Sequence, residues 1–251
     1  ENGHQVTVID RQHASAQETS FANGGQISAC HSTPWANSST PKQILKWLGR
    51  EEAPLLFRMR FDPKLFAWGL RFLRNCTDAR AKENLEKALR VAVYSRECLR
   101  QLRKDTGIDY DHRQQGILHI CRDDDELTAV ETATAQMRDF GLNRRVVSAE
   151  ECYEIEPTLR HSKARIIGGS FTPDDESGDA QKFTSLLAEK CIERGAIFKF
   201  GTTITGLDHD QGRITSVRTD QGKISGDAFA VCLGSYSPFL TKPLGIHLPI
   251  Y

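Results

Sequence analysis

The pattern of apolar and polar positions predicts a chain of mixed helices and strands. The β-branched run Gln5–Asp10 follows a turn-like sequence and predicts a short strand that ends in an acid. From Lys42 to Gly141 the period becomes helical, and Gly107 is placed to end a long helix. The apolar side chains that define this helix recur at helical spacing: Leu85, Ala88, Leu89, Ala92, Leu99 and Leu102.

A strand and a second helix are expected after Gly107. Gly116–Cys121 has the composition of a strand. The acidic run Asp123–Glu126 is typical of a helix start, where negative charge is stabilised, and Gly141 is a suitable end.

The second half of the chain predicts shorter elements. Ile166–Phe171 is a strand candidate, and Ala180–Arg194 is an amphipathic helix closed by Gly195. A strand at 197–200 and an antiparallel meander at 204–207, 213–218 and 223–225 follow, with turns at Gln-Gly pairs. The continuous apolar run Asp227–Leu233 predicts a strand buried on both faces of a parallel sheet.

Composition narrows the class of protein. The chain has 251 residues, 39% hydrophobic content, 26% charged content and a formal net charge of +0. This is the profile of a globular protein with one large domain or two smaller ones, and it offers no bulk charge for binding nucleic acid. No apolar stretch is long enough to span a membrane, and the polar start Glu1–His4 does not resemble a signal peptide.

Cysteine and histidine spacing does not predict a metal site. The seven cysteines include no C-x-x-C pair, and their odd count favours reduced core residues of a cytoplasmic protein. The eight histidines form no H-x-x-x-H motif and no cluster with cysteine in the sequence. We therefore expect neither disulfides nor a bound metal.

Three features point to dinucleotide chemistry, each with an ordinary structural alternative. Asp10, ending a strand, is placed to accept hydrogen bonds from an adenosine ribose, although such an acid is more often a turn or cap residue. Ser20–Gln26 is a glycine-containing polar loop that suits binding of a flavin or a phosphate, but it is also what an ordinary polar surface loop looks like. Gly234 follows an apolar run. A glycine there lets the backbone lie against a cofactor, or it simply forms an ordinary turn from strand to loop. Their order matches one architecture, yet no G-x-G-x-x-G occurs.

Longer motifs give a specific resemblance. The sequence resembles the D-amino-acid dehydrogenase small-subunit family of flavoproteins, within the D-amino-acid oxidase superfamily, from residue 1 to residue 251. The motifs on which the resemblance depends are Glu18–Ile27, Pro34–Trp35, Lys46–Trp47, Arg74–Cys76, Tyr94–Arg96, Arg113–Gln114, Asp174–Asp179 and Gly234–Ser237.

The resemblance implies a fold and a set of site residues. The expected class is α/β (mixed α+β): an FAD-binding Rossmann-like domain at 1–41 and 176–239, interleaved with a substrate domain of helices and mainly antiparallel sheet at 42–175 and 240–251. It also implies that the glycine loop precedes residue 1 and that further substrate domain follows Tyr251, so that the chain is truncated. The residues implied to bind FAD are Asp10, Arg11, Ser20, Asn23, Gly24, Gly25, Gln26, Ile204, Gly234 and Ser235.

The implied activity is oxidative deamination of a D-amino acid to a 2-oxo acid and ammonia, with hydride transfer to flavin N5. Such chemistry depends on positioning the substrate, so no catalytic residue is assigned. Tyr110, His112 and Arg113 lie near a plausible pocket strand, but a position at the surface of a sheet end is the favoured interpretation.

The family passes electrons to an acceptor of the respiratory chain, which makes the basic aromatic stretch Lys46–Arg74 of interest. Its seven cations exceed its three acids, and such a stretch suits the inner face of an anionic plasma membrane. A pair of core-packing helices with solvated basic faces is the favoured alternative. Two further alternatives stay open: an oxygen-using glycine or sarcosine oxidase, and a non-catalytic, cofactor-free fragment.

Overall fold

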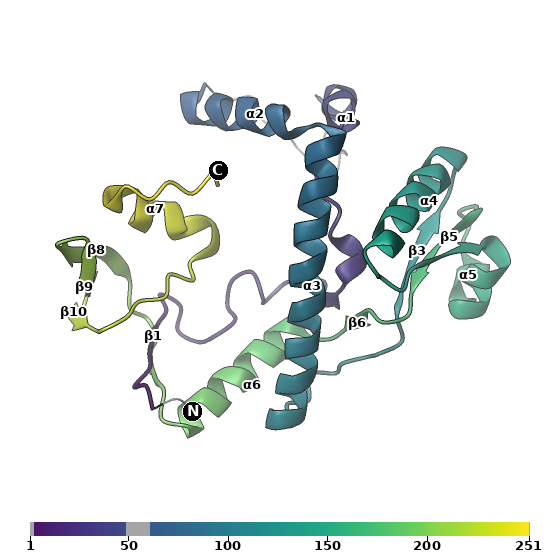
Figure 1. Cartoon of the computed structure of the whole chain (residues 1–251). Helices are drawn as coiled ribbons and strands as arrows, with labels where there is room; N and C mark the ends of the chain where they lie inside the picture. The colour runs from purple at the N-terminus through teal and green to yellow at the C-terminus, as the bar shows by residue number, and fades with distance from the viewer. Residues whose placement is uncertain (1–2, 49–60, 251) are drawn as a thin grey trace. The chain divides into compact units, whose positions relative to one another are not determined.

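The computed structural model describes residues 3–48 and 61–250, which form two compact units (Figure 1). One unit comprises the described residues of 1–22, 49–74 and 184–251, and the other comprises 23–48 and 75–183. The boundary falls within helix α6 (Ala180–Glu193). The predicted division into an FAD-binding and a substrate domain stays a prediction.

The first unit contains a small parallel sheet and an antiparallel meander. Strand β1 (Thr7–Ile9) pairs in parallel with β7 (Ile197–Lys199), with Val8 opposite Phe198. The meander joins β8 (Ile204–Asp210), β9 (Arg213–Thr219) and β10 (Gly222–Ser225). The helices are α2 (Pro63–Asn75), the 3-10 turns η3 (Gly234–Tyr236) and η4 (Lys242–Leu244), and α7 (Ser237–Thr241). Asn75 itself falls in the other unit.

The second unit is arranged around a long helix, α3 (Asp78–Thr106). An antiparallel sheet has the order β3 (Ile117–Cys121), β5 (Gly168–Thr172), β4 (Arg145–Ser148). Helices α4 (Asp124–Asp139) and α5 (Ala149–Ile155) pack on this sheet (Figure 1). A two-stranded ladder pairs β2 (Gln26–Ile27) with β6 (Glu176–Ser177); shorter helical segments are η1 (Ala29–His31), α1 (Thr40–Trp47) and η2 (Pro157–His161).

Local chemistry explains the ends of the two best-predicted helices. Thr77 caps the start of α3 by accepting from the Arg80 N–H, and Gly107 ends it in the left-handed conformation at φ +64°. Asp123 caps α4 by accepting from the Glu126 N–H. The predictions of both helices are confirmed. Leu85 and Leu89 of α3 lie in a core that also contains Met137.

One predicted strand is wrong. Asp227–Leu233 is not a strand, and five of its seven residues are exposed. An apolar strand buried on both faces needs neighbouring strands to satisfy its backbone groups. Within the residues that the structure describes, the parallel sheet contains only β1 and β7, so this run has no partner there.

A buried acid connects three separate segments of the second unit. Asp175 is fully buried and accepts hydrogen bonds from the backbone N–H groups of Ala29 (3.1 Å) and Cys30 (3.2 Å) and from the Ser28 hydroxyl (3.0 Å). Arg96 of α3 lies 3.2 Å from the same carboxylate. The loop at 28–30, the end of β5 and the middle of α3 are therefore joined at one charged group.

The neighbouring Glu176 extends this connection. It is 1% exposed and binds Arg100 and Arg103, with nitrogen–oxygen distances of 2.5 and 2.9 Å, and Gln114 at 3.2 Å. Burial alone would raise the pKa of Glu176, but hydrogen bonds from the two arginines outweigh it and the pKa lies below its usual value. Its contribution to stability is therefore complete at neutral pH and is lost as pH falls through this lowered pKa.

Asp175→Asn should destabilise the protein by about 3 kcal/mol, because it leaves the buried Arg96 with only the exposed Glu97, 3.7 Å away, as a counter-charge. The amide nitrogen also replaces one of the two carboxylate oxygens, so the backbone N–H of either Ala29 or Cys30 then faces a donor in place of its acceptor. The free energy of unfolding in urea measures the loss.

Asp174→Asn is the matched control, because only the backbone carbonyl of Asp174 bonds Arg100. It should change stability by less than about 0.5 kcal/mol. Equal effects of the two substitutions would contradict the assigned role of Asp175.

Candidate functional site

The loop after β1 positions two of the predicted residues. Asp10 continues the β1–β7 pairing, since its N–H donates to the Lys199 carbonyl at 3.1 Å. Its Oδ1 accepts the N–H of Gln12 at 2.9 Å, and its carbonyl accepts the N–H of Thr202 at 3.0 Å. Oδ2 accepts no hydrogen bond from the described part of the chain, so it is available to a hydroxyl of a ligand.

Arg11 brings this loop to the segment η3. Its guanidinium lies 4.3 Å from the centre of the Tyr236 ring and forms an ion pair with Glu18 at 2.6 Å. Hydrogen bonds with Tyr236 and Glu18 raise the pKa of Arg11, so it stays charged. Gly234 and Ser235, both exposed, precede Tyr236 in the same short segment.

The remaining predicted residues of this unit are Ile204 and Ser20. Ile204 begins β8 two residues after Thr202, whose N–H bonds the Asp10 carbonyl. It is therefore held near the end of β1. Ser20 is partly buried in the turn that contains the Phe21 N–H to Glu18 carbonyl bond of 3.0 Å.

The other four predicted residues belong to the second unit. Asn23 accepts the Gly25 N–H at 2.8 Å, which makes a tight side-chain-closed turn, and Gln26 begins β2. Gly25 has φ +62°, and a Cβ there would lie 1.9 Å from the Gly178 carbonyl oxygen. Its lack of a side chain is explained by this backbone contact, whereas a Cβ at Gly24 would meet nothing within 4 Å.

The predicted set is thus divided between the units, and each part is a local cluster. Asp10, Arg11 and Ile204 converge with Gly234 and Ser235 in one unit. The second cluster, in the other unit, comprises Asn23, Gly24, Gly25 and Gln26. Within the first of these units, the exposed Arg11 cation, the open Oδ2 of Asp10 and the glycine-containing segment η3 fit the ribose and pyrophosphate of a dinucleotide.

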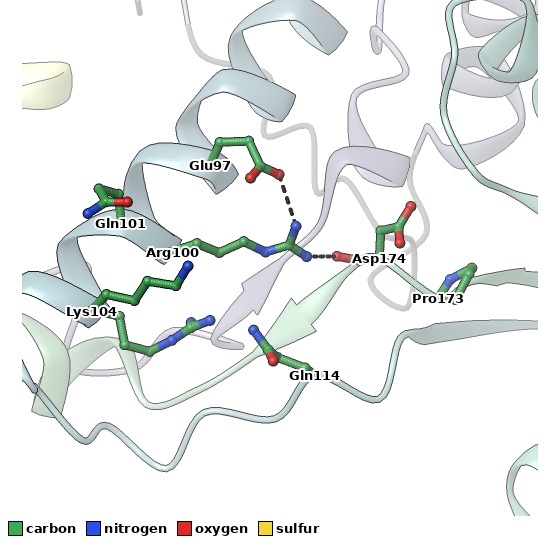
Figure 2. Close-up of a pocket in the computed structure, with 8 residues that line it drawn as sticks. Glu97, Arg100, Gln101, Lys104, Gln114, Pro173 and Asp174 are labelled. Atoms are coloured by element: carbon green, nitrogen blue, oxygen red, sulfur yellow. Dashed lines mark hydrogen bonds and ion pairs between the residues drawn. The ribbon is translucent and has the colours of Figure 1, made fainter.

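A polar pocket of about 450 Å³ lies beside α3 in the second unit (Figure 2). Arg100 crosses it, bonding Glu97 at 2.9 Å and the Asp174 carbonyl at 2.9 Å. The lining residues are Glu97, Arg100, Gln101, Arg103, Lys104, Gln114, Pro173 and Asp174. Arg100 and Arg103 are already paired with acids, so we assign the pocket no ligand.

The expected surface position is wrong for Tyr110, whereas His112 and Arg113 are exposed. Tyr110 is 2% exposed, and its hydroxyl accepts from Arg103 at 2.9 Å. Arg113 forms an isolated backbone bridge with Ser177. Tyr110 is therefore part of the packing around Gly178, where an added Cβ would strike its ring at 2.4 Å.

Sequence spacing missed a cluster of three potential ligands. Cys30, His31 and His119 each place one donor atom within 4.8 Å of the others. The two Nε2 atoms lie 2.7 Å apart. Burial, and then the neighbouring His31 and Arg144, lower the pKa of His119 to about 4, against the opposing charge of Asp175. An 88-residue separation along the chain hid this cluster from any local motif.

The structure pairs none of the seven described cysteines in a disulfide, and they are not all core residues. Cys30, Cys121 and Cys152 are buried, and Cys76 and Cys191 are partly buried. Two cysteines are exposed, Cys98 and Cys232, and for these the expected core position is wrong.

Comparison with known proteins defines the class. All 251 residues match the family model described as FAD dependent oxidoreductase. The chain therefore belongs to the FAD-dependent oxidoreductase family, whose cofactor is FAD. This confirms the class of protein that the sequence motifs indicated.

Curated relatives are considerably longer than this chain. It is 47% identical to a D-amino acid dehydrogenase of Dechloromonas aromatica, over 99% of the chain and 61% of the relative. It is 50% identical to a D-amino acid dehydrogenase of Paramagnetospirillum magneticum, over 99% of the chain and 59% of the relative. The chain thus spans about three fifths of the length of these relatives.

Solved structures confirm the mixed, FAD-binding type of fold. A glycine oxidase of Bacillus cereus matches with a TM-score of 0.63 at 20% identity, covering 96% of this chain and 52% of that one. An L-amino acid deaminase of Proteus myxofaciens matches with a TM-score of 0.65 at 18% identity, covering 98% and 44%. Across the part of the chain described, no helix is both long and apolar enough to cross a bilayer.

Proposed function

We propose that the protein catalyses FAD-dependent oxidative deamination of D-amino acids to 2-oxo acids and ammonia. The identity of 47–50% to two proteins named D-amino acid dehydrogenase, across nearly the whole chain, supports this substrate class. The single structural observation that supports it best is the convergence of the Asp10–Arg11 loop with η3 through the Arg11–Tyr236 contact.

In this proposal the chain's own residues bind and orient the cofactor. Asp10 accepts from the adenosine ribose through Oδ2, and Ile204 packs beside the adenine. Arg11, Gly234 and Ser235 contact the pyrophosphate side. Ser20, Asn23, Gly24, Gly25 and Gln26 line the stretch toward the flavin.

When FAD is bound, the chemistry it supplies is acceptance of a hydride from the substrate Cα. The substrate is left as an imine, which water hydrolyses. The overall balance is amino acid, water and oxidised acceptor giving 2-oxo acid, ammonia and reduced acceptor. The protein's part is to fix the substrate position, so we assign no general base among the residues of this chain.

We further propose that an acceptor of the respiratory chain, and not oxygen, reoxidises the enzyme at the cytoplasmic face of the plasma membrane. Helix α2 supports this, because none of its residues is buried. Phe66, Leu70 and Leu73 follow one helical face and are exposed by 55, 55 and 48%. Lys64, Arg71 and Arg74 add positive charge to the same helix. The middle of the basic stretch, 49–60, lies outside the described residues.

The reaction class is tested with the purified full-length protein. D-amino acids should reduce an artificial dye acceptor at least tenfold faster than their L-enantiomers, with release of the 2-oxo acid and ammonia. A glycine- or sarcosine-type oxidase would instead release hydrogen peroxide in proportion to substrate consumed. A colourless preparation without flavin absorbance would contradict both and favour the non-catalytic alternative.

Asp10→Asn should weaken FAD binding by about tenfold, because a neutral amide is a poorer acceptor for a ribose hydroxyl than a carboxylate. Its Oδ1 still accepts the Gln12 N–H, so the turn is retained. Flavin fluorescence during reconstitution of the apoprotein measures the affinity. Asp210→Asn, at the exposed end of β8, is the control and should leave it unchanged.

Reversing charge in α2 tests the membrane contact. Arg71→Glu with Arg74→Glu should weaken sedimentation with anionic vesicles by at least about thirtyfold, since each cation near such a surface contributes about 1 kcal/mol. Lys87→Glu with Arg90→Glu makes the same change at the same spacing on α3 and should have no comparable effect. Equal partitioning of both double variants would overturn the assignment of α2.

A further inference from the structure

We propose that Cys30, His31 and His119 form a binding site for a zinc ion, independent of the flavin chemistry. The site contains one thiol and two imidazoles from η1 and β3 of the same compact unit. The proposed function does not use these three side chains. Zinc binding can therefore be tested whether or not the protein oxidises amino acids.

The donor geometry suits a small tetrahedral cation. The three donor atoms lie within 4.8 Å of one another, and the two Nε2 atoms are 2.7 Å apart. Zinc–nitrogen bonds of about 2.0–2.1 Å and a zinc–sulfur bond of about 2.3 Å put tetrahedral neighbours between roughly 3 and 4 Å apart. The distance between the two Nε2 atoms would therefore have to increase by only about an ångström or less for the ion to fit between them.

The surrounding structure positions the thiol. Asp175 fixes the turn by accepting the Cys30 N–H at 3.2 Å, and it also accepts the Ser28 hydroxyl hydrogen. Ser28 Oγ lies 3.0 Å from Cys30 Sγ. Because the single hydroxyl hydrogen of Ser28 points to Asp175, the thiol donates to Ser28. Arrangements of this kind around a ligand orient it and strengthen binding.

The histidines are held in a state that binds metals. Two Nε2 atoms at 2.7 Å require one ring to donate and the other to accept, so the pair cannot be doubly protonated. Neutral imidazole is the form that coordinates a metal, and the accepting ring already presents its Nε2 lone pair to the other ring. On binding, the donating ring moves its proton to Nδ1, and both Nε2 lone pairs face the ion.

Proton balance is simple. A thiol binds a metal as its thiolate, so the ion must displace the proton of Cys30. Zinc, a neutral thiol and two neutral imidazoles give a thiolate complex and one proton released to solvent. The Arg144 guanidinium, whose Nη1 donates to the Cys30 carbonyl at 3.3 Å, favours the thiolate, while Asp175 opposes it and attracts the cation.

The donor set selects the metal class. Sulfur and imidazole nitrogen favour zinc over magnesium or calcium, which prefer oxygen ligands. Three protein ligands leave a fourth position of the tetrahedron, and the exposure of His31 makes it accessible to water or a small anion. Cys30 by contrast is only 3% exposed, so its sulfur is shielded from solvent.

The purified full-length, FAD-bound protein should retain one zinc ion per chain after equilibrium dialysis against micromolar zinc chloride. X-ray absorption at the zinc edge should show one sulfur at about 2.3 Å and nitrogens at about 2.0–2.1 Å. This spectrum comes from the unaltered protein and does not depend on any variant folding.

Cys30→Ser and His119→Gln should each weaken zinc binding by at least about tenfold, the lower end of what loss of a supporting contact costs. Cys98→Ser and His161→Gln alter exposed residues outside the cluster and should leave affinity unchanged. Circular dichroism checks that each variant is folded. Zinc that binds without sulfur in its shell, zinc affinity unchanged in both cluster variants, or no zinc retained would each overturn the proposal.

Discussion

The second unit depends on one electrostatic constraint: two adjacent buried acids face a column of arginines on a single helix. Asp175 and Glu176 are fully or almost fully buried, and Arg96, Arg100 and Arg103 of α3 supply the opposing charge. Removing Asp175 takes the nearer acid from the buried Arg96, and removing Glu176 takes the acid from Arg103. Breaking a buried pair in this way costs more than the pair contributes. The register between α3 and the β5–β6 segment is therefore strongly specified.

The same constraint determines the shape of the loop that follows Asn23. Asp175 holds residues 28–30, while the β2–β6 ladder and the Gly178 N–H to Gly25 carbonyl bond of 2.9 Å hold residues 25–27. Both the loop proposed for the flavin and the proposed zinc ligand Cys30 thus belong to a backbone fixed by interactions within its own unit. A rigid scaffold of this kind places ligand contacts without help from the ligand.

Elements with local signals were predictable from the sequence. Gly107 and the Asp123 cap determine helix ends through groups a few residues apart, so the period and the caps were sufficient. The capping box of Ser148 and Glu151 starts α5 and is also a local signal, three residues apart in the sequence. The prediction of a strand at Asp227–Leu233 was wrong for the opposite reason, because a buried strand depends on neighbouring strands that are distant in the sequence. Asp10 followed from its place at the end of a predicted strand, and Arg11 followed from the family resemblance. The approach of His119 to Cys30 depends on the tertiary fold alone.

The arginine column of α3 also makes the length of that helix matter. The three arginines share one face only because they are spaced by four and three residues. Inserting or deleting a single residue between Leu89 and Arg96 would rotate the arginines by about 100° relative to the apolar core positions before them. The length of α3 thus fixes the direction in which its arginines point relative to the core. In proteins that descend from this sequence, the exposed residues of α3 can be substituted. The number of residues between its apolar core positions and its three arginines has to stay the same.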